Sequence, residues 1–162
     1  MRLPELHASL TQLFNELVDG PTGEAFMLNT GDAGLLRSLD KLTATDASRS
    51  TNQGATIAAH AQHVRYGLSL MNKWAAEGGN PFADAKWDEA WKLSSVDDRA
   101  WQEIRKGLAD ECRRWSGALK TERELAGPAL LGTMGSIAHL AYHLGAIRQI
   151  DKTARGPREG TF

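Results

Sequence analysis

The chain has 162 residues, of which 41% are hydrophobic and 24% charged, and its 19 basic and 20 acidic residues give a formal net charge of -1. Acidic and basic side chains are interleaved, so we expect no nucleic-acid or other polyanionic partner. No stretch approaches the roughly 20 apolar residues of a membrane span, and residues 1–17 carry charges where a signal peptide is apolar. The single cysteine, Cys112, excludes an internal disulfide, and we expect a cytoplasmic protein.

The first half of the chain predicts two long helices. Leucines and a phenylalanine recur three and four positions apart in residues 3–17, and the sequence DGP at 19–21 ends this helix. A shorter helical piece is predicted around residues 35–42, followed by a polar break. The apolar period returns over residues 56–77 and stops at GGNP, so we predict the second long helix there.

The second half predicts a long connection and two further helices. Residues 78–96 are too long for a tight hairpin, and we expect one helical turn in them around Trp87 and Trp91. A polar helix with a narrow apolar stripe is predicted over residues 97–124, and a last helix over residues 129–152.

No segment shows the alternating pattern of a β-strand, so the predicted fold class is all-α. Four long helices with long connections fit a four-helix bundle with at least one crossover that is not a hairpin. We expect a single domain over residues 1–152 and a loose tail over residues 153–162.

Two histidines of the last helix, His139 and His143, lie four residues apart. Successive residues advance by about 100°, so both rings leave one face, where the small residues Gly132 and Ser136 leave them room. In the helix at 56–77, His63 also belongs to a core-facing strip. Facing helices of a bundle are where metal sites are built, and a shared ion would offset the cost of burying three imidazoles. A lone inward histidine is more often a core residue with one hydrogen bond, but the second helix favours a metal site.

Other conspicuous residues have more ordinary interpretations. His60, one turn before His63, could be a ligand, a partner behind the ligands or a partly exposed residue, and we favour the last two over ligation. We interpret His7 as a residue on the flank of its helix and Cys112 as inert. Five tryptophans could form an aromatic ligand pocket, but we favour packing in the core and against the long connection.

Two stretches, TIAAHAQHVRYGL (56–68) and SIAHLAYHLGAIRQI (136–150), resemble the DinB-like (YfiT-like) superfamily of bacterial four-helix bundles. In that superfamily one histidine comes from the second helix and two from an HxxxH pair on the last, and the spacing in TIAAHAQH selects His63 over His60. The resemblance implies an up-down-down-up bundle, a divalent metal ion on His63, His139 and His143, and a homodimer. It also implies no particular reaction, although some relatives are S-transferases or isomerases that use a low-molecular-weight thiol.

The expected function is metal-dependent chemistry on a small molecule, such as thiol-dependent S-transfer, because three imidazoles leave positions open on the ion. Zinc or nickel is favoured, and iron or copper is also compatible with imidazole ligands. The glutamate of an HExxH peptidase is missing between His139 and His143, and Tyr142 and Gln149 lie off the histidine strip. The alternatives are a stress-responsive, non-catalytic dimer with a structural ion, and a metal-free helical binding module.

Overall fold

The computed structural model describes residues 3–157, which form six α-helices and two 3-10 helices without any strand in that range. The all-α class predicted from the sequence is therefore confirmed. None of the helices within the described range has the length and apolar character needed to cross a lipid bilayer. The long helices are α1 (Leu3–Asp19), α4 (Ile57–Glu77), α5 (Asp98–Lys120) and α6 (Pro128–Ile150), and the short helices α2 (Gly34–Asp40) and α3 (Ala44–Ala47) lie between α1 and α4.

Local signals in the sequence set the ends of the long helices. The hydroxyl of Thr56 caps α4 by accepting the N–H of Ala59 at 3.1 Å, and Gly78 ends that helix with a φ of +72°. Asp97 caps α5 through its carboxylate in the same way. Helix α5 ends at Lys120, four residues before the predicted end, because residues 121–124 are all polar and have no apolar side chain to bury.

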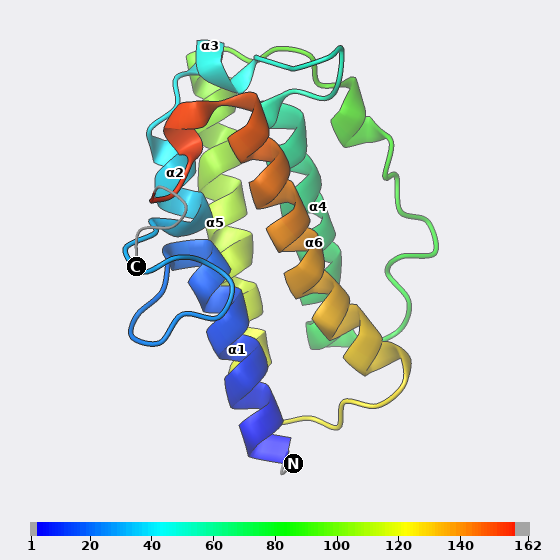
Figure 1. Cartoon of the computed structure of the whole chain (residues 1–162). Helices are drawn as coiled ribbons and strands as arrows, with labels where there is room; N and C mark the ends of the chain where they lie inside the picture. The colour runs from blue at the N-terminus through cyan, green and yellow to red at the C-terminus, as the bar shows by residue number, and fades with distance from the viewer. Residues whose placement is uncertain (1–2, 158–162) are drawn as a thin grey trace.

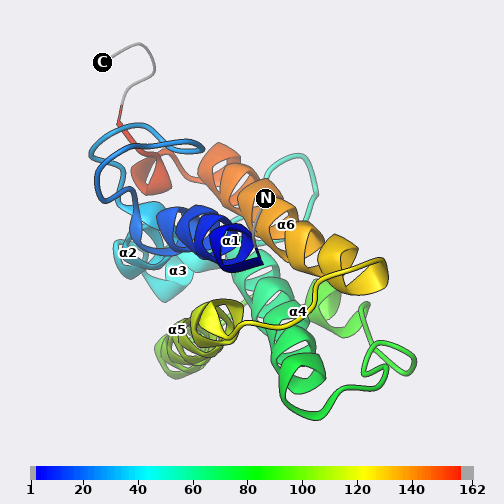
Figure 2. The same ribbon diagram turned by 90° about the horizontal axis from the view of Figure 1, so that it is seen from below.

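The four long helices form a helical bundle, and their order around it is α1, α5, α4, α6 (Figure 2). Helix α4 lies between α5 and α6, and α1 contacts both of these helices as well. A single apolar cluster draws on all four, and its fully buried members include Phe14, Ile57, Trp115 and Leu144. Helix α6 therefore faces α4 across one side of the bundle, which is where the predicted histidines lie.

The connection from α4 to α5 follows the outside of the bundle along its length (Figure 1). It contains the 3-10 helix η1 (Glu89–Lys92), which is the helical turn predicted near Trp91. The Tyr66 hydroxyl of α4 accepts the N–H of Lys86 at 2.9 Å, and Thr56 donates to the Leu93 carbonyl at 2.9 Å. These bonds hold the connection, with Trp87 and Trp91, against α4.

The chain stays on the bundle after α6. The 3-10 helix η2 (Lys152–Ala154) follows directly, and Ala154 is fully buried. Arg148 donates to the Ala154 carbonyl at 3.1 Å and to the buried carboxylate of Asp32 at 2.7 and 3.0 Å. The prediction of a loose tail from residue 153 is therefore wrong for residues 153 and 154. Tertiary contacts hold these residues on the bundle, and such contacts leave no helical periodicity in the sequence. Residues 158–162 of the predicted tail lie outside the described residues.

His7 is buried, so its interpretation as an ordinary flank residue is wrong. Its Nδ1 lies 2.9 Å from the Leu119 carbonyl oxygen, and its Nε2 lies 3.2 Å from the main-chain nitrogen and 2.9 Å from the carbonyl oxygen of Arg123. Nδ1–H can donate to the Leu119 carbonyl, and Nε2 meets main-chain groups of Arg123, so main-chain groups surround both ring nitrogens. His7 thus joins α1 to the end of α5, a contact that the pattern of the first helix does not contain.

Candidate metal centre

Three histidine rings from α4 and α6 converge at one point between these helices. The Nε2 of His139 lies 3.2 Å from the Nε2 of His63 and 2.9 Å from the Nε2 of His143. One nitrogen from each ring lies within 4.8 Å of the other two. The one-turn spacing on α6 and the packing of α6 against α4 therefore bring the three predicted ligands together in space.

The environment of the three rings favours their neutral form. His63 and His143 are buried, while His139 is more exposed. Burial, followed by the neighbouring His139, lowers the pKa of His63 to about 4 and that of His143 to about 3, and burial also lowers the pKa of His139. Neutral imidazole nitrogens have a free lone pair, so the cluster can coordinate a metal ion at neutral pH without first losing protons.

His60 lies behind the cluster and is buried. Its Nδ1 is 2.8 Å from the Nδ1 of His143, on the opposite side of that ring from the Nε2 that faces His139. Burial lowers the pKa of His60 as well. A neutral His60 can accept the Nδ1–H of His143, which leaves the His143 Nε2 lone pair directed at the cluster. This contact suits a residue that orients a ligand, and its burial excludes the exposed position considered from the sequence.

Two tryptophans of the connection cover the cluster. The ring of Trp91 stacks on His63 with centroids 4.3 Å apart and lies 5.9 Å from His143, and Trp87 lies 5.7 Å from His63. Both indoles are partly exposed, with 41% and 38% of their surface accessible. The prediction that the tryptophans serve only packing is therefore right for the buried Trp101 and incomplete for this pair, since a surface connection brings them to the histidines.

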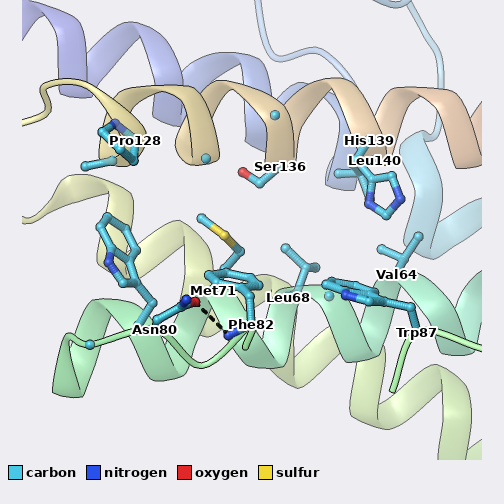
Figure 3. A pocket seen from close by; sticks show the side chains of 16 residues that line it. Val64, Leu68, Met71, Asn80, Phe82, Trp87, Pro128, Ser136, His139 and Leu140 are labelled. Carbon is cyan, nitrogen blue, oxygen red and sulfur yellow. Dashed lines mark hydrogen bonds between the residues drawn. The ribbon is translucent and has the colours of Figure 1, made fainter. Parts of the chain in front are cut away.

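A cavity of about 610 Å³ opens beside the cluster between α4, α6 and the connection (Figure 3). Of the three clustered histidines, His139 is the one that lines it, and Pro128 lies at the other end in the view of Figure 3. Gly67 and Gly132 contribute no side chains to its walls, so α4 and α6 leave space between them. The cluster is thus accessible to a small molecule from the side of His139.

The remaining residues singled out in the sequence lie away from the three nitrogens. Tyr142 is 68% exposed and touches His143 only with its ring, at a centroid distance of 5.0 Å. Gln149 is exposed on the outer side of α6. Cys112 is buried, and burial raises its pKa to about 12, which agrees with the prediction that it is inert.

Sequence reasoning missed the cover formed by Trp87 and Trp91 and the contact between His60 and His143. The tryptophans belong to an irregular connection, whose path has no periodic signal in the sequence. The spacing of His60 and His63 places their rings about 60° apart on one helix, but it does not show which ring meets α6. Both features depend on how separate segments pack.

The donor set and its spacing suit a divalent transition-metal ion. Imidazole nitrogens bind zinc, nickel, iron and copper. Two nitrogens held about 2.0–2.1 Å from a tetrahedral zinc lie about 3.3 Å apart, close to the observed 3.2 and 2.9 Å. No family model, curated protein or solved structure matches the chain. The three-histidine group is the feature of the described residues that bears most directly on function.

Proposed function

We propose that the protein binds a divalent metal ion through His63, His139 and His143 and uses it in a reaction on a small molecule. The observation that carries the proposal is the convergence of three Nε2 atoms beside a cavity, with separations of 3.2 and 2.9 Å along the cluster. A closed structural zinc site takes four protein ligands, whereas three leave room for a substrate.

The described residues do not supply a partner for all three Nε2 atoms at once. His63 Nε2 and His143 Nε2 both approach the single Nε2 of His139, and neutral rings have few protons to share among these contacts. Buried polar groups without satisfactory partners are costly. A metal ion at the centre would use the lone pairs of all three Nε2 atoms at once, so the three histidines fit a metal ion.

Each residue has a distinct task in this proposal. His63, His139 and His143 hold the ion, His60 keeps the His143 ring in the tautomer with a free Nε2, and Trp91 excludes water from one side of His63. The ion would supply Lewis acidity at the substrate atom that it binds. Zinc or nickel is the proposed ion, with iron also compatible, and S-transfer with a low-molecular-weight thiol is the proposed class of reaction.

We also propose membership of the DinB-like superfamily and the up-down-down-up order of α1, α4, α5 and α6. The two histidine stretches support the family. The connection from α4 to α5, which follows the length of the bundle instead of making a hairpin, supports the order of the helices (Figure 1). A homodimer is proposed through the outer face of α6, where exposed residues form an uncharged, mostly apolar strip: Leu131, Met134, Ala138, Tyr142 and Gly145.

Elemental analysis of the full chain, purified without chelators, tests the metal proposal. We expect about one divalent ion per chain, and we expect His63→Ala, His139→Ala and His143→Ala each to weaken metal binding by more than about 100-fold, the upper range for residues that only touch ligands. His7→Ala is the matched control, because it removes a buried histidine outside the cluster. Absence of stoichiometric metal from every preparation would overturn the proposal.

Thermal unfolding of the same variants separates catalysis from a structural role. We expect the metal-free protein to remain folded, with an unfolding temperature only a few degrees lower, and to lose turnover of a thiol with an electrophile, because a substrate in the cavity reaches the ion beside His139. A large fall in unfolding temperature on metal removal would favour the alternative, a non-catalytic dimer whose ion ties α4 to α6.

A further inference from the structure

The walls of the cavity beside His139 are mainly apolar. Aliphatic and aromatic side chains from α4 and the connection form one wall, and none of the described residues that line the cavity is an Asp, Glu, Lys or Arg. Its volume of about 610 Å³ falls within the roughly 300–1,000 Å³ of ordinary ligand pockets. The principal apolar lining residues are Val64, Leu68, Met71, Trp74, Phe82 and Trp87.

Hydrogen bonds within the protein engage the Ser136 hydroxyl and the side-chain oxygen of Asn80, two polar groups of the cavity. Ser136 accepts the indole N–H of Trp115 at 3.0 Å and donates to the Thr133 carbonyl at 2.7 Å. Asn80 accepts the N–H of Phe82 through its side-chain oxygen at 3.2 Å (Figure 3). A ligand therefore finds apolar surface along most of the cavity and a polar contact at the histidine end.

The cavity is also elongated. Its α6 wall extends from Pro128 to His139, and eleven residues of helix span about 16 Å. Arg123 lies over the ring of Trp74 at 5.5 Å, but it is not among the lining residues, and its nitrogens donate to the main-chain carbonyls of Ala75 and Ala118. A ligand charge placed far from His139 would thus meet no opposite charge from the walls.

We propose that this cavity binds an elongated, uncharged and mainly apolar small molecule that presents one terminal donor atom to the His139 end. The identity of the compound as a substrate rests on the proposed function, because the donor atom is the one that a metal ion would hold. Binding of its apolar body depends on the walls and does not require the ion. Charged thiols do not match these walls, so the molecule in the cavity is the apolar reactant.

Two probes with the same body test the inference on the full chain. The first is 4-phenylbutane-1-thiol, and the second carries a carboxylate at the para position of its ring, so that the charge lies far from the thiol. Titration calorimetry is carried out on metal-free and Co²⁺-loaded protein. We expect the carboxylate to weaken binding at least about tenfold in both forms, because the lining residues offer it no cation and the transfer of a charge from water to an apolar cavity is unfavourable. Equal affinities, or tighter binding of the carboxylate probe, would overturn the inference.

The metal-free arm separates this inference from the proposed function. If the neutral probe binds metal-free protein and no preparation contains stoichiometric metal, the metal proposal is overturned and the inference about the cavity ligand is supported. If the protein contains stoichiometric metal but does not bind the neutral probe, the metal proposal is supported and the inference about the cavity ligand is overturned.

Substitution of Gly132 blocks the cavity from α6. A Cβ there would make ordinary contact with Met71 at 3.9 Å, so Gly132→Leu extends into the space that the ligand would use. Gly117→Leu is the matched control, since this exposed glycine of α5 has no atom within 4 Å of its Cβ position among the described residues. We expect at least about tenfold weaker binding of the neutral probe in Gly132→Leu only, given the area it loses. Equal binding in the two variants would overturn the inference.

Asn80→Lys provides a second test of the cavity if Gly132→Leu does not fold. Asn80 is exposed on the connection and lines the cavity away from His139 (Figure 3). A lysine there adds a cation near the far end, so we expect the preference for the neutral probe over the carboxylate probe to fall several-fold. An unchanged preference would show that the far end of the probe does not occupy this cavity and would overturn the inference.

Discussion

Two regions of this protein bury histidine side chains, and they satisfy them in different ways. His7 bonds main-chain groups of Leu119 and Arg123 through its two ring nitrogens. His63, His139 and His143 instead meet one another, beside a cavity. A ring that the main chain satisfies stabilises the packing of helices. Rings that meet only other rings retain the capacity to bind something further, and this difference separates a structural histidine from a candidate ligand.

The largest expected difference between the two regions is the response of the cluster to acid. Burial lowers the pKa of His63 to about 4 and that of His143 to about 3, from 6.5 without burial. Below pH 6.5 the unfolded chain therefore binds more protons than the folded chain, so stability is complete above that pH and is lost as the pH falls toward 3. Denaturant unfolding of metal-free protein from about pH 8 to about pH 4 measures this loss.

His143→Leu is the control for the acid response, because it removes the ring with the lowest pKa and keeps an apolar side chain in its place. We expect a shallower dependence of stability on pH in this variant. The same slope in His143→Leu and in the wild type would show that the cluster does not cause the acid sensitivity.

Removal of His7 should reduce stability without changing the metal. His7→Ala leaves the Leu119 carbonyl and the Arg123 N–H without their partner, so we expect a loss on the order of 2 kcal/mol in the free energy of unfolding. His7→Asn keeps a donor near Leu119 and should lose less. Denaturant unfolding and metal analysis are measured on both variants. Loss of metal from His7→Ala under folded conditions would break the distinction between the two regions.

The smallest expected effect comes from His60. His60→Phe keeps a ring but removes the nitrogen that faces His143, so we expect metal affinity to fall by about tenfold, the lower end for a residue that supports a ligand. His60→Asn retains an acceptor at the corresponding position and should bind metal more tightly than His60→Phe. A chelator competition measures both affinities. Loss of metal in His60→Phe as complete as in His143→Ala would make His60 a ligand.

The sequence predicted most of the helical framework, because helical periodicity, caps and stops act over a few residues. Thr56, Asp97 and Gly78 mark ends that the structure contains. The same local geometry predicted that His139 and His143 leave one face of a helix and that His63 faces the core of another. These statements need only the angle of about 100° between successive residues.

Tertiary packing decided what surrounds those histidines. The contact of His60 with His143, the stacking of Trp91 on His63 and the burial of His7 all join residues far apart in the chain. The cavity depends on where the irregular connection passes α4 and α6. Local periodicity determines which way a side chain leaves its own helix, whereas the partner that it meets depends on the path of other segments, and for that reason only the folded structure distinguishes the structural histidine from the candidate ligands.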